Sequence, residues 1–311
     1  MEVKKMSKTK SVNGNSTIAL SIRGLTKSYG KVEALKGIDL EVKYGEIFGF
    51  LGPNGAGKTT TIRCMLDSIR PDGGEMRLLG FDPQSDPIEV QKRTGYLPGE
   101  MQFYENLTAE RQLRFFNDMR GNSVDWQYIR QLARQLNLDL TQPIKNLSKG
   151  NKQKVGVIQA LMHRPKLLLL DEPTSGLDPL MQQEVLNLIR ETNRQGATVF
   201  FSSHIMSEVE QVANRVAIIR SGQIAEVADT SALMHRSLNR LTVRFKRPVE
   251  IDCFSQLPGV ELLSQANNTV AQFQVAGDME TFVQFLGQTP VLDLETEHPS
   301  LEEIFLSYYK E

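Results

Sequence analysis

The 311-residue chain is poor in several features, and each shortage excludes a class of protein. Its two cysteines, Cys64 and Cys253, lie far apart and outside any metal-ligand spacing, so neither a disulfide framework nor a cysteine metal site is expected. No run of about 18 apolar residues occurs, which argues against a membrane-spanning helix. Lys and Arg number 36 against 37 Asp and Glu, so the basic surplus of a dedicated nucleic-acid binder is missing.

A phosphate-binding pattern lies in residues 46–61, which read EIFGFLGPNGAGKTTT. The apolar run IFGFL predicts a strand buried on both faces, and a helix is predicted from Lys58 to Ser68. Between them, the glycines of GPNGAGKT let backbone N–H groups converge on a polyphosphate, and the start of a helix favours an anion. We expect Lys58 to reach the outer phosphates and Thr59 to ligate Mg²⁺.

Two further apolar runs end in polar side chains. Residues 167–170 are four leucines followed by Asp171 and Glu172, and residues 198–201 lead to His204. Because the carboxyl ends of parallel strands share one edge of a sheet, these side chains should lie beside the phosphate loop. We expect Asp171 to hold Mg²⁺ or its waters, Glu172 to polarise the attacking water, and His204 to contact the γ-phosphate.

The remaining signals divide the chain into three parts. Residues 1–16 are predicted to be a disordered tail because they are lysine-rich and polar, without an apolar core. Residues 17–236 are predicted to form an α/β domain that begins with antiparallel strands and contains a helical lobe over about residues 101–150. Residues 237–311 restart the strand and helix signals and predict a small α+β domain of split βαβ type, with a last helix opened by Ser300.

Within the predicted helical lobe, apolar residues recur at near-helical spacing between Thr108 and Leu138. We expect two or three helices there and no strand. Three aromatic side chains, Phe115, Phe116 and Trp126, are expected to pack in the core of the lobe rather than to contact a ligand.

Three further motifs follow the phosphate loop in sequence order: LSKGN at residues 147–151, SGLD at residues 175–178 and the Ser203-His204 pair. With these motifs, residues 18–228 resemble the nucleotide-binding subunit of an ABC transporter. The resemblance implies a P-loop core with an antiparallel β subdomain and a helical lobe. It also implies that residues 167–172 form Walker B and that His204 is the switch histidine. Walker A would comprise Gly52, Pro53, Asn54, Gly55, Ala56, Gly57, Lys58, Thr59 and Thr60.

The resemblance also assigns residues outside the phosphate loop. Tyr29 would stack on adenine, and Asp178 would lie in the loop that couples the two sites of a dimer. Ser148, Gly150 and Asn151 would form the signature that binds the γ-phosphate held by a partner subunit. In the family the signature usually reads LSGGQ, so Lys149 and Asn151 are departures.

A second departure follows the predicted strand at residues 95–97. The family places a glutamine after GYLP to sense Mg²⁺ and the attacking water, whereas this chain has Gly99 and then Glu100. Glu100 and Gln102 are the nearest alternative donors, and water is the other candidate to complete the metal shell.

The resemblance implies an ATP hydrolase that uses Mg²⁺ and closes head to tail with a second ATPase subunit. A homodimer is sufficient because one chain carries the whole motif set. The partner would be an integral-membrane permease supplied as a separate chain, which places the subunit at the cytoplasmic face of the membrane. The ending PSLEEIF, residues 299–305, is similar to that of drug, antibiotic and sodium exporters, so export is the expected direction.

Two other classes of protein explain less of the sequence. A soluble ABC-type ATPase that acts on ribosomes or DNA would carry two such domains or a long coiled coil, and the chain shows neither; no nucleic-acid partner is expected. Another P-loop enzyme, such as a kinase or a small GTPase, would not explain the signature or His204.

Overall fold

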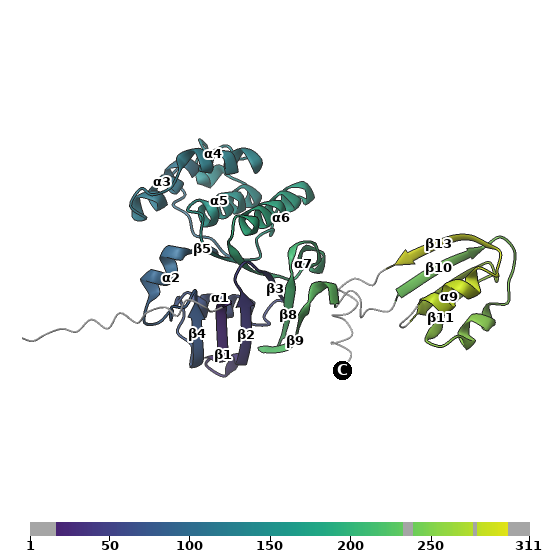
Figure 1. Cartoon of the computed structure of the whole chain (residues 1–311). Helices are drawn as coiled ribbons and strands as arrows, with labels where there is room; N and C mark the ends of the chain where they lie inside the picture. The colour runs from purple at the N-terminus through teal and green to yellow at the C-terminus, as the bar shows by residue number, and fades with distance from the viewer. Residues whose placement is uncertain (1–16, 233–238, 276–278, 298–311) are drawn as a thin grey trace, which may run out of the picture. The chain divides into compact units, whose positions relative to one another are not determined.

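The computed structural model describes residues 17–232, 239–275 and 279–297 (Figure 1). The chain divides into two units, residues 1–227 and 228–311, so the division lies somewhat before the predicted boundary at 236/237. The predicted tail 1–16 and the last helix predicted from Ser300 lie outside the described residues. Within the described residues, every helix is too short or too polar to cross a membrane.

A six-stranded sheet is the centre of the first unit, and its strand order is β5-β6-β7-β3-β8-β9. Neighbouring strands from β5 to β8 pair in parallel. Every residue of β3, β6 and β7 is buried, which explains why these strands are continuous apolar runs. The strands are β3 (Ile47–Leu51), β5 (Thr94–Leu97), β6 (Leu167–Asp171), β7 (Thr198–Ser203), β8 (Arg215–Arg220) and β9 (Gln223–Asp229).

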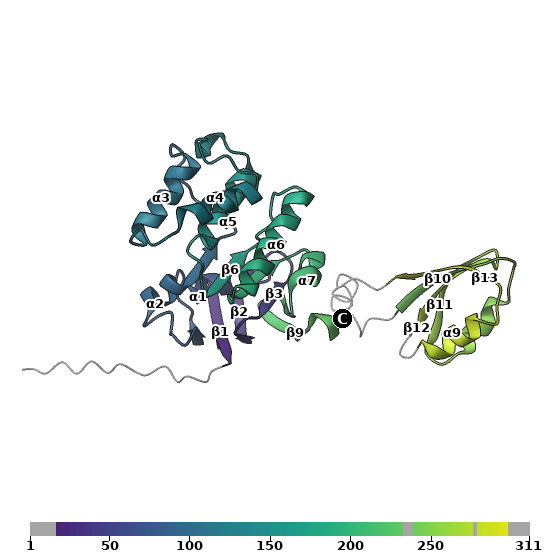
Figure 2. The same ribbon diagram turned by 45° about the horizontal axis from the view of Figure 1, so that its top comes forward.

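Helices cover both faces of this sheet, as Figures 1 and 2 show. On one face, α1 contacts both β6 and β2, and on the other face α7 packs on β3, β7 and α6. Pro87 and Pro179 stand at the first positions of their helices, where a missing N–H costs nothing. The helices are α1 (Lys58–Met65), α2 (Pro87–Arg93), α5 (Lys149–Leu161), α6 (Pro179–Arg194) and α7 (Met206–Val212).

A three-stranded antiparallel sheet of order β2-β1-β4 lies beside α1. Its strands are β1 (Ile18–Tyr29), β2 (Val32–Lys43) and β4 (Gly73–Leu78). Beyond Ile22, register shifts interrupt the regular pairing of β1 with β2, so buried and exposed residues no longer alternate strictly along β1.

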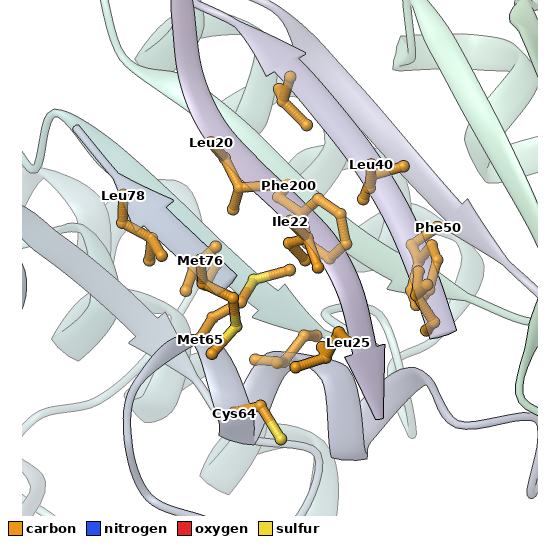
Figure 3. Close-up of a cluster of buried hydrophobic side chains, with 14 of the residues drawn as sticks. Leu20, Ile22, Leu25, Leu40, Phe50, Cys64, Met65, Met76, Leu78 and Phe200 are labelled. Atoms are coloured by element: carbon orange, nitrogen blue, oxygen red, sulfur yellow. The ribbon is translucent and has the colours of Figure 1, made fainter. Parts of the chain in front are cut away.

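A core of buried apolar residues lies between this sheet, α1 and the central sheet, and Figure 3 shows part of it. Apolar residues that alternate along β1 and β4 point toward α1, and rings of the central sheet complete the cluster. Burial of such side chains supplies the main favourable free energy of folding. The labelled members are Leu20, Ile22, Leu25, Leu40, Phe50, Cys64, Met65, Met76, Leu78 and Phe200.

The helical lobe contains α3 (Ala109–Met119), α4 (Trp126–Gln135) and η1 (Ile144–Asn146) before α5 begins. Side chains of Thr108 and Asp125 accept hydrogen bonds from backbone amides at the starts of α3 and α4. The expectation that three aromatic side chains fill the lobe core is wrong for Phe115, which is 39% exposed, while Phe116 and Trp126 are half-buried. Phe115 instead makes edge contacts with Tyr104 and Phe116.

The second unit contains a four-stranded antiparallel sheet of order β11-β12-β10-β13. This interleaved order is the split βαβ topology that the sequence predicted, with a 3₁₀ helix in the first crossover. Phe254 lies in its core and packs against Phe245, Phe273, Phe282 and Phe285. The elements are β10 (Asn239–Phe245), η2 (Ile251–Gln256), β11 (Val260–Ala266), β12 (Val270–Val275), α9 (Glu280–Leu286) and β13 (Val291–Glu297).

Because the two units have separate cores, Phe254→Ala should destabilise only the second unit, by about 3–5 kcal/mol for the loss of a buried phenylalanine. Calorimetry of the full chain should show two unfolding transitions, of which the substitution lowers one and nucleotide raises the other. If only one unfolding transition appears, and both the substitution and nucleotide shift its temperature, the two units unfold together.

Candidate functional site

The phosphate loop connects the carboxyl end of β3 to α1, as the sequence predicted. Gly57 adopts φ 112°, and a Cβ on it would lie 2.8 Å from the backbone oxygen of Ala34, so only glycine fits there. The loop forms one wall of a pocket of about 140 Å³. The pocket is lined by Ala34, Asn54, Gly55, Gly57, Lys58, Thr59, Thr60 and Glu172, whereas Gly52, Pro53 and Ala56 lie in the loop outside this lining.

Lys58 lies in this pocket and is only 5% exposed. Its ammonium donates hydrogen bonds to the backbone oxygens of Gly52, at 2.6 Å, and Pro53, at 3.1 Å, and lies 3.6 Å from Oε1 of Glu172. Burial lowers the pKa of Lys58, and the nearby carboxylates of Glu172 and Asp171 oppose that shift. The ammonium is therefore a buried charge held at the loop, which an anion can reach.

Asp171 ends β6 and is 1% exposed. Its Oδ2 accepts a hydrogen bond from Thr59 Oγ1 at 2.7 Å, and its Oδ1 accepts one from Ser202 Oγ at 2.5 Å. The carboxylate thus joins the first turn of α1 to the ends of two neighbouring strands. The two predicted metal ligands, Thr59 and Asp171, are in direct contact.

Glu172 follows Asp171 in a left-handed conformation, φ 50°, which is uncommon for a residue with a side chain. The backbone amide of Glu172 donates to both the carbonyl oxygen and the hydroxyl of Ser202, each at 3.2 Å. This conformation directs the Glu172 carboxylate toward Nδ1 of His204, at 3.1 Å, as well as toward Lys58. Strained backbone of this kind is common where a side chain must be aimed.

Gly99 is in contact with the same cluster. A Cβ on Gly99 would lie 3.1 Å from Oδ2 of Asp171, so backbone, and no side chain, lies beside the carboxylate at this point. Glu100 and Gln102, the alternative donors considered from the sequence, are both exposed.

The signature residues open α5. Ser148 caps this helix, because its Oγ accepts a hydrogen bond from the backbone amide of Asn151 at 3.2 Å. A Cβ on Gly150 would lie 2.8 Å from the backbone oxygen of Gly176, so glycine permits the close approach of the SGLD loop. The structure places Ser148 at the surface, and the signature residues are not among those that line the phosphate pocket.

Asp178 and Tyr29 are also exposed and outside the lining of that pocket. The Asp178 side chain caps α6 by accepting a hydrogen bond from the backbone amide of Met181 at 3.1 Å. Tyr29 ends β1 and is 47% exposed, with the ammonium of Lys27 at 5.9 Å from its ring centroid. Asp72 pairs with that ammonium at 2.8 Å.

Two residues that hold the cluster together were not assigned a role from the sequence. Ser202 bonds both Asp171 and Glu172, as described above. Gln153 of α5 donates from its amide to the backbone oxygens of Glu172, at 3.1 Å, and Pro173, at 3.0 Å. In the sequence, only their positions mark them. Ser202 directly precedes the Ser203-His204 pair, and Gln153 lies a little more than one helical turn after Ser148.

The arrangement can bind an anionic group at Lys58 and the loop amides, and it can accept a proton at Glu172. Glu172 lies beside the Lys58 ammonium and bonds to the imidazole of His204, and Thr59 bonds to Asp171. These groups are the ones that phosphoryl transfer to water requires.

Comparison with known proteins agrees with this geometry. The family model described as ABC transporter matches residues 35–175. The linearmycin resistance ATP-binding protein LnrL of Bacillus subtilis is 30% identical over 304 residues, which cover 93% of this chain and 97% of LnrL.

Two solved structures are similar as well. An ATP-binding subunit of an ABC transporter superposes with a TM-score of 0.64 at 28% identity, over 70% of this chain and 92% of that one. The dimeric, post-hydrolysis ATP-binding cassette MJ0796 with ADP and Pi gives a TM-score of 0.62 at 23% identity, over 68% and 98% of the chains, and supports the fold.

Replacing Lys58 by Ala should weaken binding of a nucleoside triphosphate by roughly 10–100-fold, because a charged hydrogen bond contributes about 1.5–3 kcal/mol. Titration with a fluorescent ATP analogue measures this, and Lys166→Ala, which removes an exposed lysine, is the matched control. Equal affinities for the wild type and the Lys58 variant would contradict the assignment of this pocket.

Proposed function

The chain belongs to the ATP-binding proteins of ABC transporters, and we propose that it hydrolyses ATP as one half of a head-to-tail dimer to drive export through a separate membrane permease. The observation that carries the proposal is the contact of Glu172 with both Lys58 and His204, beside Asp171 and the phosphate loop. Together they bring a carboxylate base to the place where the loop binds phosphate.

In the proposed reaction, the loop amides and Lys58 bind the β- and γ-phosphates of ATP and stabilise the charge that develops during transfer. Glu172 orients the attacking water and accepts its proton. His204 contacts the γ-phosphate and, through its Nδ1, holds the carboxylate of Glu172 in position. The phosphates compete with Glu172 for Lys58, which leaves the carboxylate free to bind water.

Thr59 and Asp171 fit a magnesium site, because a hydroxyl and a carboxylate are in contact at the edge of the phosphate pocket. Mg²⁺ usually takes few protein ligands and completes its shell with phosphate oxygens and water. When bound, the ion would neutralise phosphate charge. Gly99 offers no side-chain ligand, so we propose that water completes the shell at that point.

The dimer is proposed because the signature residues and the phosphate pocket lie on separate surfaces of the chain. Ser148 and Asp178 are exposed, and neither lines the pocket. A second copy placed head to tail would bring Ser148, Gly150 and Asn151 to the γ-phosphate, with Asp178 between the two sites and Tyr29 against the adenine. The MJ0796 cassette is dimeric, which supports this arrangement.

The helical lobe is the proposed contact with the permease. Tyr104, Phe115 and Met119 are exposed apolar side chains of the lobe, and they lie near a cavity of about 230 Å³ whose lining includes Phe116 and Arg120. Burial lowers the pKa of Arg120, and no acidic partner for it occurs within the described part of the chain. A permease segment with apolar side chains and one carboxylate would suit this surface.

Export is the proposed direction because LnrL, which matches nearly the whole chain, is named for resistance to linearmycin. The subunit would then be held at the cytoplasmic face of the membrane by its permease. The transported substrate would be selected by the permease, since the cluster around Glu172 has the chemistry of phosphate transfer alone.

Glu172→Gln should retain ATP binding and lower the hydrolysis rate by roughly 10²–10⁴-fold, as expected for the loss of a general base. Size-exclusion chromatography with ATP should then show a stable dimer that the wild type forms only transiently. Glu191→Gln, an exposed substitution on α6, is the control. Near-normal turnover in Glu172→Gln would refute its role as the base.

If the signature acts on the partner's nucleotide, Lys58→Ala and Ser148→Ala subunits should complement each other. Their mixed dimer, purified through two different tags, has one intact composite site and one doubly damaged site. We expect measurable ATP hydrolysis in the mixed dimer and almost none in either mutant homodimer. Activity equal to the mean of the two homodimers would indicate that each subunit works alone.

A further inference from the structure

Glu208 is a buried carboxylate that the proposed reaction does not use. It lies in the first turn of α7 and is only 4% exposed. Both of its carboxylate oxygens accept hydrogen bonds from hydroxyls: Oε2 from Ser203 Oγ at 2.7 Å, and Oε1 from Thr174 Oγ1. Within the described residues no cationic side chain pairs with it, so these two hydroxyls are the donors that offset its burial.

The first hydroxyl belongs to the turn that carries His204. Ser203 Oγ accepts a hydrogen bond from the backbone amide of Ile205 at 2.9 Å, so this hydroxyl fixes the backbone on either side of His204. The Ser203 carbonyl oxygen also accepts from the amide of Gly52, at 3.3 Å, at the start of the phosphate loop. The side chain of His204 is 46% exposed, so its position depends on this backbone more than on packing.

The second hydroxyl belongs to the turn that leaves Glu172. The amide of Ser175 donates to the carbonyl oxygen of Glu172, and the amide of Leu177 donates to that of Thr174, each at 3.1 Å. Thr174 therefore lies within the turns that connect Glu172 to Asp178. Its hydroxyl bonds this segment to Glu208 of α7.

We propose that Glu208 is a positioning residue that holds Glu172 and His204 in register by joining the segments that carry them. A carboxylate can keep both hydrogen bonds only while Ser203 and Thr174 stay in a fixed relation. Loss of either bond would leave a buried oxygen without a donor, so the two segments are coupled in energy. The same link extends to Asp178, whose loop Thr174 opens.

The inference rests on the proposed roles of Glu172 and His204 and predicts a particular kinetic pattern. Glu208→Ala should lower kcat by roughly 10–100-fold, since small misplacement of a catalytic group has effects of this size. The KM for ATP should change less than about threefold, because Glu208 does not line the phosphate pocket. Glu208→Gln should recover much of kcat, because an amide of the same shape can bond to both hydroxyls.

A double-mutant cycle tests the coupling directly. Ser203→Ala and Thr174→Val should each lower kcat, and their combined effect should fall short of the product of the two, because both hydroxyls bond to the same carboxylate of Glu208. In the Glu208→Ala background, Thr174→Val should change kcat by less than about twofold, whereas Ser203→Ala also removes the acceptor of the Ile205 amide and should lower kcat further. Ser207→Ala, an exposed change on the same helix, is the control and should leave kcat unchanged.

Two results would overturn the proposal: normal kcat in a folded Glu208→Ala variant, or effects of Ser203→Ala and Thr174→Val that multiply fully. If Glu208→Ala does not fold, the same two substitutions are made in Glu208→Gln. Effects of Ser203→Ala and Thr174→Val on kcat that multiply fully in that variant would also overturn the proposal. A merely structural role would lower the melting temperature without splitting kcat from KM. Failure of the proposed function can be told apart from failure of the role of Glu208. In the first case, Glu172→Gln would retain ATP turnover, with or without a substitution at Glu208.

Discussion

The contact of Asp171 with Thr59 and Ser202 is the interaction on which the rest of the site depends. Asp171 ends β6, Ser202 is the penultimate residue of β7, and Thr59 lies in the first turn of the helix that follows β3. The contact therefore fixes the carboxyl ends of β3, β6 and β7 against each other. All three strands are buried, and their pairing leaves little freedom at their ends. The chemistry therefore lies at the edge of a rigid sheet, while the reacting side chains occupy the loops beyond it.

Burial of charge sets a second constraint. Lys58, Asp171 and Glu208 are each at least nine-tenths buried. Lys58 bonds to backbone oxygens of its own loop and lies 3.6 Å from Glu172, whereas Asp171 and Glu208 accept hydrogen bonds from other segments of the chain. A buried ion without partners would cost several kcal/mol, so the loops that supply these partners cannot move independently. The same bonds that allow the charges to be buried thus connect the phosphate loop, the Glu172 segment and the His204 segment.

The sequence predicted those parts of the site whose chemistry is local. The phosphate loop, the acidic end of β6 and His204 follow apolar runs, and a parallel sheet brings such ends together. Ser202, Gln153 and Glu208 could not be found in this way, because their partners are 30 or more residues distant or depend on how a helix is rotated. Phe115 was misjudged for a similar reason, since periodicity does not show which neighbours cover a helix face.

The departures from the family pattern lie where the structure leaves little room. Gly99 brings backbone within contact distance of Asp171, so a side chain there could extend only away from the carboxylate or displace it. Lys149 replaces a glycine, yet the methylenes of its side chain lie alongside Gly176, which has no side chain to oppose them. The lysine stem therefore follows the SGLD loop while its ammonium stays at the surface, as long basic side chains commonly do. Both departures keep the close approach of α5 and the Asp171 cluster to their neighbouring loops, which is the geometry that the hydrogen bonds of Gln153 and Ser202 require.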